Sequence, residues 1–219
     1  MLLRIGGILS APELGAIIHA LEQAGYQDGR RTAGWHAKDV KRNEQAVPSP
    51  ALDAVLAKVR EALLAHEVFM AAARPKSFVK LLASRYAPGM TYGTHVDDAL
   101  MDGRRTDLSF TLFLNDPASY DGGALVIEDT LENRSIRLNA GELILYPSGA
   151  LHAVEPVTRG TRLAIVGWLR SYLRDPAHRE ILFDIELALR EVFERDGKSG
   201  LFDRLVKTRT NLLRLWAED

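Results

Sequence analysis

The spacing of apolar and polar positions divides the chain into three parts, of which the first, up to about residue 76, is rich in helix signals. In SAPEL, Ser10 can cap a helix, with Pro12 in its first turn and Glu13 three residues after the cap. In PALDAVLAKVREALLAH, an apolar stripe of helical period predicts a second helix; it comprises Leu52, Val55, Leu56, Val59 and Leu63. The polar, turn-rich segment between them is expected to form a long ordered loop or a pair of irregular strands.

The second part, residues 77–171, consists of short apolar runs separated by turn residues. Many short strands at close intervals are typical of a β-sandwich or a β-barrel. In TDLSFTLFLND, apolar Phe110 and Leu112 alternate with polar Ser109 and Thr111, which suggests a strand with one face suited to a small polar ligand. The expected strands lie in FVKLLASRY, TDLSFTLFLND, GGALVIED, RSIRL, ELILYP, HAVEPV and TRLAIVGWLRS.

The third part begins at RDPAHRE, where Asp175 can cap a helix and Pro176 suits its first turn. Apolar residues at helical spacing follow, GKSG interrupts them, and a final helix is expected in the last twenty residues. These helices either pack on the β-core or make a subunit contact. The chain is therefore expected to be α+β and mainly β, with a domain over residues 1–175 (β-core 77–171) and a C-terminal helical extension over 176–219.

Composition and charge exclude several classes of protein. The 219 residues carry a net charge of −1, which gives no electrostatic case for a nucleic-acid partner or an anionic membrane. The absence of cysteine excludes disulfides, thiolate metal sites and a cysteine nucleophile. No apolar run approaches the roughly 20 residues of a membrane span, and the N-terminal stretch lacks the basic leader of a signal peptide. We therefore expect a cytoplasmic protein.

Three side chains in the β region suggest a metal site. On a strand, residues two apart point to the same face, so His95 and Asp97 can converge on one ion. His152, at the start of a later strand, is the best candidate for a third ligand. Two histidines and one carboxylate form the facial triad of non-haem Fe(II) oxygenases, which leaves positions free for substrates. An H-x-D pair alone is a weak signal and is more often structural.

An arginine supports the metal-site hypothesis. Arg162 lies ten residues after His152, on one face of the apolar strand RLAIVGW together with Val166 and Trp168. Burying a guanidinium is unfavourable unless an anion meets it, and its planar fork suits a carboxylate. The alternative is an arginine at the edge of a barrel that reaches solvent.

Taken together, these motifs resemble the Fe(II)/2-oxoglutarate dioxygenases. The similarity rests on YAPGMTYGTHVD, on RTDLSFTLFLNDPASYDGGALVIEDT and on AGELILYPSGALHAVEPVTRGTRLAIVGWLRS, and it covers about residues 78–175. The sequence is most similar to the bacterial PKHD-type hydroxylases, which are relatives of prolyl 4-hydroxylase and are often associated with iron uptake. The resemblance implies a double-stranded β-helix, or jelly roll, with helices on one flank.

The resemblance also implies roles for individual residues. His95, Asp97 and His152 would bind Fe2+, and Arg162 would bind the far carboxylate of 2-oxoglutarate. Tyr86 and Thr111 would help to hold this co-substrate. Gly122 and Gly123 match a turn in which the backbone bends without a side chain. O2 would be the second co-substrate and L-ascorbate the reductant, while Asp98 is an additional carboxylate beside the triad.

The implied reaction is hydroxylation of a C–H bond, with 2-oxoglutarate converted to succinate and CO2. The substrate would be a small molecule or a peptide or protein side chain, and the C-terminal helices would serve in a homo-oligomer. The main alternative is a cupin-type jelly roll that binds a metal or a sugar without redox chemistry. A zinc hydrolase and a scaffold protein with a vestigial site are further alternatives.

Overall fold

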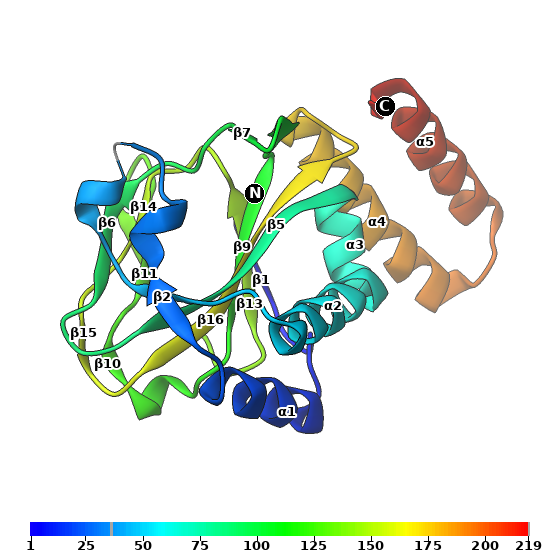
Figure 1. Cartoon of the computed structure of the whole chain (residues 1–219). Helices are drawn as coiled ribbons and strands as arrows, with labels where there is room; N and C mark the ends of the chain where they lie inside the picture. The colour runs from blue at the N-terminus through cyan, green and yellow to red at the C-terminus, as the bar shows by residue number, and fades with distance from the viewer. Residues whose placement is uncertain (36, 219) are drawn as a thin grey trace.

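The computed structural model describes residues 1–35 and 37–218, and two antiparallel β-sheets that face each other form its centre (Figure 1). The larger sheet has the strand order β1 (Leu3–Ile5), β13 (Leu143–Pro147), β9 (Leu108–Phe113), β16 (Arg162–Ser171), β5 (Pro75–Tyr86), β4 (Glu44–Ala46) and β2 (Tyr26–Asp28). The smaller sheet has the order β12 (Asn133–Ile136), β11 (Leu125–Glu128), β14 (His152–Val154), β6 (Thr91–His95) and β3 (Lys41–Arg42). This arrangement is the jelly roll that the sequence resemblance implied.

Two short two-stranded sheets and three short 3-10 turns complete the described β-region. β7 (Leu100–Met101) pairs with β8 (Arg104–Arg105), and β10 (Asp121–Gly122) pairs with β15 (Val157–Arg159). The 3-10 turns are Gly29–Thr32, Lys38–Val40 and Pro117–Ser119.

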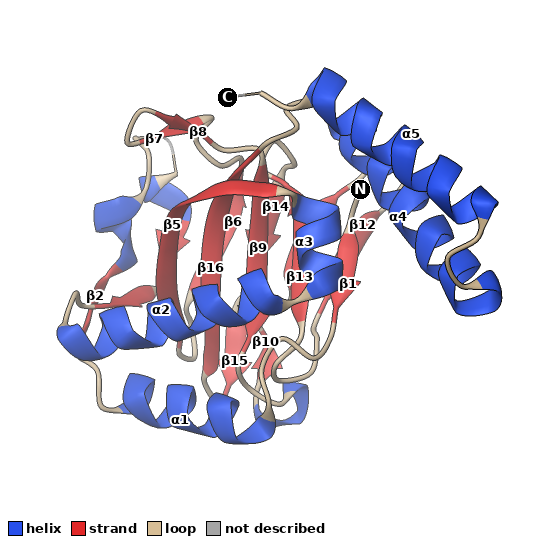
Figure 2. Ribbon diagram, turned by 90° about the vertical axis from the view of Figure 1, so that its right-hand side faces the viewer, coloured by secondary structure: helices blue, strands red, loops and turns tan. Residues whose placement is uncertain are grey.

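Three helices cover the outer face of the larger sheet, as Figure 2 shows: α1 (Ala11–Glu22), α2 (Pro50–Ala65) and α3 (Glu67–Ala73). The predicted capping box of α1 is present, because Ser10 accepts from the backbone of Glu13 and the Glu13 side chain accepts from the backbone N–H of Ser10. The apolar faces of these helices and of the sheet form the principal core, which includes Leu21, Leu63, Phe69, Phe110 and Leu112.

The alternation of residues along β9 and β16 separates this core from the space between the sheets. On β9, Phe110 and Leu112 face the helices, as do Ile165 and Leu169 on β16. The opposite face carries Ser109 and Thr111 on β9 and Arg162, Val166 and Trp168 on β16, all of which line a cavity between the sheets. The two-sided pattern predicted for these strands is therefore confirmed, and it directs polar groups into the cavity.

The glycine pair predicted for a turn has the expected backbone. Gly122 and Gly123 both have positive φ, at 71° and 62°. A Cβ on Gly122 would lie 2.1 Å from the carbonyl oxygen of Pro156, so no other residue fits there. The turn after β10 thereby passes close to the strand that leads to Arg162.

The structure adds elements to the predicted set. The N-terminal part contributes four strands to the two sheets, β1 to β4, so the irregular-strand alternative for residues 26–50 holds. HAVEPV is divided into β14 and the start of β15, because the sheet partner changes from β11 and β6 to β10. His66 ends α2 and caps the separate helix α3, rather than lying within one helix.

Two long helices follow the β-region: α4 (Pro176–Asp196), capped by Asp175 as predicted, and α5 (Gly200–Trp216). α4 packs on α3, and α5 packs on α4 and extends away from the sheets (Figure 1). The division into residues 1–175 and 176–219 stays a prediction. Among the described residues, none of the helices combines the length and the apolar character needed to cross a membrane.

Candidate active site

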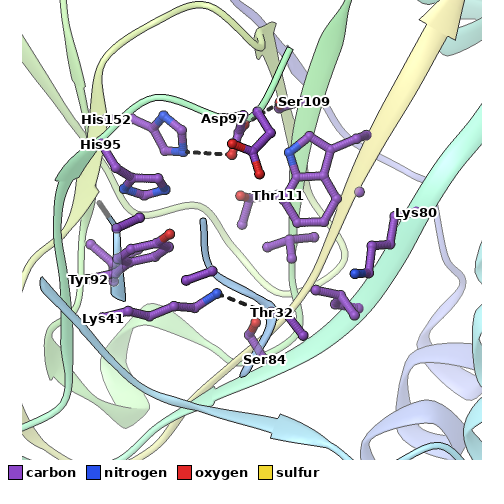
Figure 3. A pocket seen from close by; sticks show the side chains of 18 of the residues that line it. Thr32, Lys41, Lys80, Ser84, Tyr92, His95, Asp97, Ser109, Thr111 and His152 are labelled. Atoms are coloured by element: carbon purple, nitrogen blue, oxygen red, sulfur yellow. Dashed lines mark hydrogen bonds and ion pairs between the residues drawn. The ribbon is translucent and has the colours of Figure 1, made fainter. Parts of the chain in front are cut away.

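A strand pair places the two histidines, and the segment after it places the aspartate. β6 pairs with β14 so that His95 lies opposite His152. The expectation that His95 and Asp97 share a strand is wrong, because β6 ends at His95 and Asp97 lies in the irregular segment that follows. Since His152 is the first residue of β14, β6 has no partner on this side beyond His95, and the ladder stops. The chain nevertheless brings the Asp97 carboxylate to both imidazole rings (Figure 3).

The three side chains form a compact group of potential metal ligands. One donor atom from each lies within 4.8 Å of the others, and Nε2 of His152 is 3.8 Å from Oδ1 of Asp97. The Nδ1 atoms of His95 and His152 lie 2.9 Å and 3.0 Å from the carbonyl oxygens of Gly93 and Ala150. Because an Nδ1 that donates to a carbonyl puts the ring lone pair on Nε2, both rings are in the form that binds a metal through Nε2.

Hydrogen bonds from the larger sheet hold the aspartate. Oγ of Ser109 on β9 donates to Oδ2 of Asp97 at 2.6 Å, and it lies 2.8 Å from Oγ of Ser148. One carboxylate oxygen is thus fixed by the protein while the other faces His152. Metal-ligating carboxylates are commonly oriented in this way by groups that do not touch the metal.

Aromatic rings enclose the histidines on both sides. The Tyr92 ring stacks on His95 with centroids 3.6 Å apart. On the opposite face of the Tyr92 ring, Nζ of Lys41 lies 4.7 Å from the ring centroid (Figure 3). Tyr146 meets His152 edge-on at 5.2 Å. Burial raises the pKa of the Tyr146 phenol well above its ordinary value, and the nearby charge of Asp97 adds to the effect. The Tyr146 phenol therefore stays neutral beside the carboxylate.

The predicted co-substrate residues lie in the same cavity, which has a volume of about 290 Å3. Arg162 begins β16, is 1% exposed, and lies beside the rings of Tyr86 and Phe113 at 5.2 Å and 5.1 Å. Within the described residues its Nε and Nη2 have no hydrogen-bond partner. Burial raises the pKa of Tyr86, and the charge of Arg162 opposes this. Tyr86 lies opposite Arg162 in the strand register, and Thr111 lines the cavity beside Tyr146.

Some residues of the site were not singled out from the sequence. Ser109 and Trp168 stand out in the sequence only as members of strand faces, and nothing in it singles out Lys80 or Tyr92. The basic pair Lys41–Arg42 is expected from the sequence to be solvated, which is wrong for Lys41, because this residue is only 6% exposed. The period of two along β5 could have indicated Lys80, since it lies on the same face as Tyr86. Asp98 is exposed and lies outside the group of three ligands, and its backbone carbonyl accepts from Thr106. The sequence also offers His36, in the polar loop before β3, as a residue that could line a substrate entrance, and this residue lies outside the described residues.

Comparisons with known proteins agree with this geometry. Residues 81–170 match the family model of the 2OG-Fe(II) oxygenase superfamily. Over the full length of both chains, the sequence is 48% identical to a PKHD-type hydroxylase of Maricaulis maris and 52% identical to one of Synechococcus elongatus.

Solved structures show the same fold at lower identity. The crystal structure of a Pseudomonas putida prolyl-4-hydroxylase is similar with a TM-score of 0.56 and 23% identity, over 78% of this chain and 92% of that chain. HygX from Streptomyces hygroscopicus, solved with nickel and 2-oxoglutarate bound, gives a TM-score of 0.58 at 15% identity, over 78% and 84% of the two chains.

Fold, ligand group and family model together define an Fe(II)- and 2-oxoglutarate-dependent oxygenase. Within this class the chain belongs to the PKHD-type hydroxylases, since its relatives match from end to end at about half identity. Membership implies Fe2+ and 2-oxoglutarate, and the donor set fits the metal. The buried, unpartnered guanidinium of Arg162 fits a carboxylate of the co-substrate.

Proposed function

We propose that the protein hydroxylates a C–H bond of a small molecule or of a peptide or protein side chain, and that 2-oxoglutarate is decarboxylated to succinate and CO2 in the same reaction. The observation that carries this proposal is a two-histidine, one-carboxylate group that shares one cavity with a buried, unpartnered arginine. A cupin-type jelly roll without redox chemistry would need no such arginine, and the family membership also disfavours it.

His95, Asp97 and His152 hold the ferrous ion in this proposal. When bound, the iron together with O2 and 2-oxoglutarate supplies the oxidant that attacks the C–H bond. The protein contributes the facial arrangement of ligands, and Ser109 keeps the carboxylate in place. With three protein ligands, a bound ion would be accessible to O2 and 2-oxoglutarate from the cavity.

Arg162 binds the far carboxylate of 2-oxoglutarate, with Tyr86 and Thr111 beside it. The guanidinium is supported by two aromatic rings but lacks hydrogen-bond acceptors at two nitrogens, which is unfavourable until an anion arrives. A carboxylate can accept two parallel hydrogen bonds from such a fork. The apolar rings exclude water from the pair and thereby strengthen it.

The cellular setting is proposed on the family resemblance. Ascorbate keeps the iron reduced, the protein works in the cytoplasm, and its substrate belongs to iron uptake or iron homeostasis. The C-terminal helices mediate self-association, and three apolar side chains on them support this: Phe193 is 52% exposed, Leu201 42% and Leu215 76%. Light scattering of the full chain tests the self-association, and a monomer at every concentration would contradict it.

Activity and metal binding together test the reaction. Purified protein with Fe2+, 2-oxoglutarate and O2 is expected to release succinate, and a cell lysate is expected to raise the rate. Asp97→Ala should abolish turnover and lower iron affinity by more than the roughly 10–100-fold typical of losing a group that only orients a ligand. Asp98→Ala, the matched control at the neighbouring exposed carboxylate, should keep its iron affinity. Wild-type protein without turnover, or an Asp97→Ala variant with normal iron affinity, would refute the proposal.

A further inference from the structure

Two lysines that the iron and the co-substrate leave unexplained line the cavity. Lys41 on β3 and Lys80 on β5 extend toward each other from opposite walls (Figure 3). Lys41 is only 6% exposed. In the part of the chain that the structure describes, neither ammonium has a carboxylate within ion-pair distance, and the hydrogen bond of Lys41 to Oγ1 of Thr32 is long, at 3.4 Å.

The charge of Lys41 is poorly compensated. The pKa of its ammonium is lowered to about 8, mainly by burial; repulsion from Lys80 contributes to the shift, and the charges of Asp97 and Asp28 oppose it. Both ammonium groups face the same cavity, so one anion could meet them together. When a divalent cation occupies the site, it takes up the negative charge of Asp97, so the cavity wall around Lys41 then lacks an anion.

This cationic pair is separate from the co-substrate anchor. Lys80 and Tyr86 lie on the same face of β5, six residues apart, which corresponds to roughly 20 Å along a strand. Tyr86 lies opposite Arg162 in the register, whereas Lys80 lies opposite Trp168. A five-carbon diacid held by Arg162 is shorter than this backbone separation, so it leaves Lys80, beside Trp168, available to a second anion.

Trp168 adds a neutral donor to this end of the cavity. Its indole Nε1 is buried and has no hydrogen-bond partner among the described residues. Buried donors in native proteins are nearly always satisfied, so an unpartnered one that lines a cavity indicates an acceptor that is brought by a ligand. The acidic residues at the mouth do not fill this role, since Asp98 is exposed and Asp102 faces Arg104 at 4.0 Å.

We propose that Lys41, Lys80 and Trp168 bind a carboxylate of the primary substrate and so select organic acids, or peptides that end in or carry a free carboxylate. The inference rests on the proposed function, which supplies the reaction. Held at this end, the substrate would present a carbon atom to the side of the cavity where His95, Asp97 and His152 lie. The carboxylate would neutralise the ammonium pair and give the indole its acceptor.

A binding experiment with acetate tests the anion site without turnover. The protein, loaded with Zn2+ in place of iron and with 2-oxoglutarate to occupy Arg162, carries 13C-labelled lysine. At pH 6.5 and constant ionic strength, acetate should shift the ε-carbon signals of Lys41 and Lys80 in a saturable way. Acetamide, which has the same shape and no charge, should not. Equal responses to the two probes, or none, would overturn the anion site.

Variants test whether the acetate-induced shifts arise at the two lysines of the cavity. Lys80→Met should weaken acetate binding at Lys41 by roughly ten- to a hundredfold, the range for losing one charge-assisted hydrogen bond. Lys38→Met is the matched control, because this lysine is exposed on the same segment and does not line the cavity. Unchanged acetate affinity in Lys80→Met would overturn the pairing of the two lysines. The same samples also give the affinity for 2-oxoglutarate. Wild-type protein that does not bind 2-oxoglutarate would refute the proposed function instead.

Turnover with lysate fractions tests the substrate class. Metabolite and peptide fractions are each split on an anion exchanger, and succinate release is measured with iron-loaded enzyme. The retained material should raise the rate, and the fraction that does so distinguishes a free organic acid from an acidic peptide. Lys41→Met and Lys80→Met should need at least tenfold more of it, with the KM for 2-oxoglutarate unchanged. Stimulation confined to the unretained material would overturn the inference while leaving the oxygenase assignment intact.

Discussion

At the scale of single residues, Arg162 is suited to binding an anion, but burial of its charge is unfavourable for the folded state. Its guanidinium is 1% exposed, and two of its nitrogens have no hydrogen-bond partner in the described part of the chain. A buried charge without a partner destabilises the folded state, and well-packed apolar replacements of buried charges are often neutral or stabilising. The residue is therefore better explained by the anion that it binds than by folding.

Arg162→Met should separate these two effects. Without 2-oxoglutarate, the variant should be as stable as the wild type or more stable, by up to about 4 kcal/mol, because the buried charge is removed. Its affinity for 2-oxoglutarate should fall by about 2–5 kcal/mol. Thermal unfolding and calorimetric titration measure the two quantities. A less stable variant with normal 2-oxoglutarate affinity would show that the arginine serves packing.

The contribution of Lys41 to the stability of the fold should increase with pH, whereas the contribution of a lysine in an ion pair decreases as the pH rises. Its pKa is about 8 in the folded protein, below the value of 10.5 that an exposed lysine has, so between these values the unfolded chain binds more protons. Stability from this residue therefore rises with pH from about 8 to about 10.5 and is lowest below pH 8.

Lys41→Met should consequently be more stable than the wild type at pH 7, by on the order of 3 kcal/mol. This advantage should shrink as the pH rises through 8 and toward 10.5, because the wild-type lysine then loses its charge. Urea unfolding of both proteins at a series of pH values measures the difference. A difference that stays constant with pH would mean that Lys41 keeps an ordinary pKa.

At the scale of elements, the close contact between β16 and the layers around it depends on Gly167. A Cβ at this position would lie 2.5 Å from the ring of Phe110 and 2.7 Å from Leu81. The glycine thus lets β16 pack between its neighbours while Val166 and Trp168 face the cavity.

Gly167→Ala should destabilise the protein by about 1–3 kcal/mol, because the methyl group overpacks a dense core. Gly15→Ala is the matched control on α1, where nothing lies within 4 Å of the added Cβ. It should be neutral or stabilising by up to about 1 kcal/mol, because alanine favours the helix. Thermal unfolding compares the two, and equal stability in both variants would contradict the packing explanation.

The same elements show what the sequence could reveal. The alternation in β9 and β16 predicted which face is polar, and capping residues predicted where α1 and α4 begin, because these signals are local. The strand β1 was not predicted, and β2 to β4 were predicted only as one of two alternatives, because each has two or three residues and forms by pairing with distant strands. For the same reason the position of Asp97 beyond the end of β6, and its bond to Ser109 twelve residues later, depended on tertiary structure.

At the scale of the whole molecule, the protein is a layered structure in which the site lies between two sheets and the helices α1 to α3 cover the larger one (Figure 2). The two histidines belong to the smaller sheet, whereas Ser109 and Arg162 belong to the larger one. The two histidine ligands and the co-substrate anchor thus come from different sheets. Binding of the metal ion and of 2-oxoglutarate would therefore connect the two sheets through the cavity.

Metal binding should therefore slow local opening of the segment that carries Asp97. With Zn2+, amide hydrogen exchange over residues 96–106 should slow several-fold, because this segment would be tied to both histidine strands. Exchange in α5, which has no buried residue, should stay the same. Mass spectrometry of peptides with and without the metal makes the comparison, and equal slowing everywhere would indicate only a general stabilisation.

The position of Asp97 just after the end of β6 has one more consequence. The segment that begins with it continues directly into the β7–β8 hairpin, whose Leu100, Met101 and Asp102 border the cavity. A ferrous ion bound by Asp97 would thus hold the β7–β8 hairpin in place at the cavity entrance, in addition to its part in the reaction. Without iron, the cavity entrance would be wider and less well defined, and the iron-loaded enzyme would offer substrates a narrower entrance.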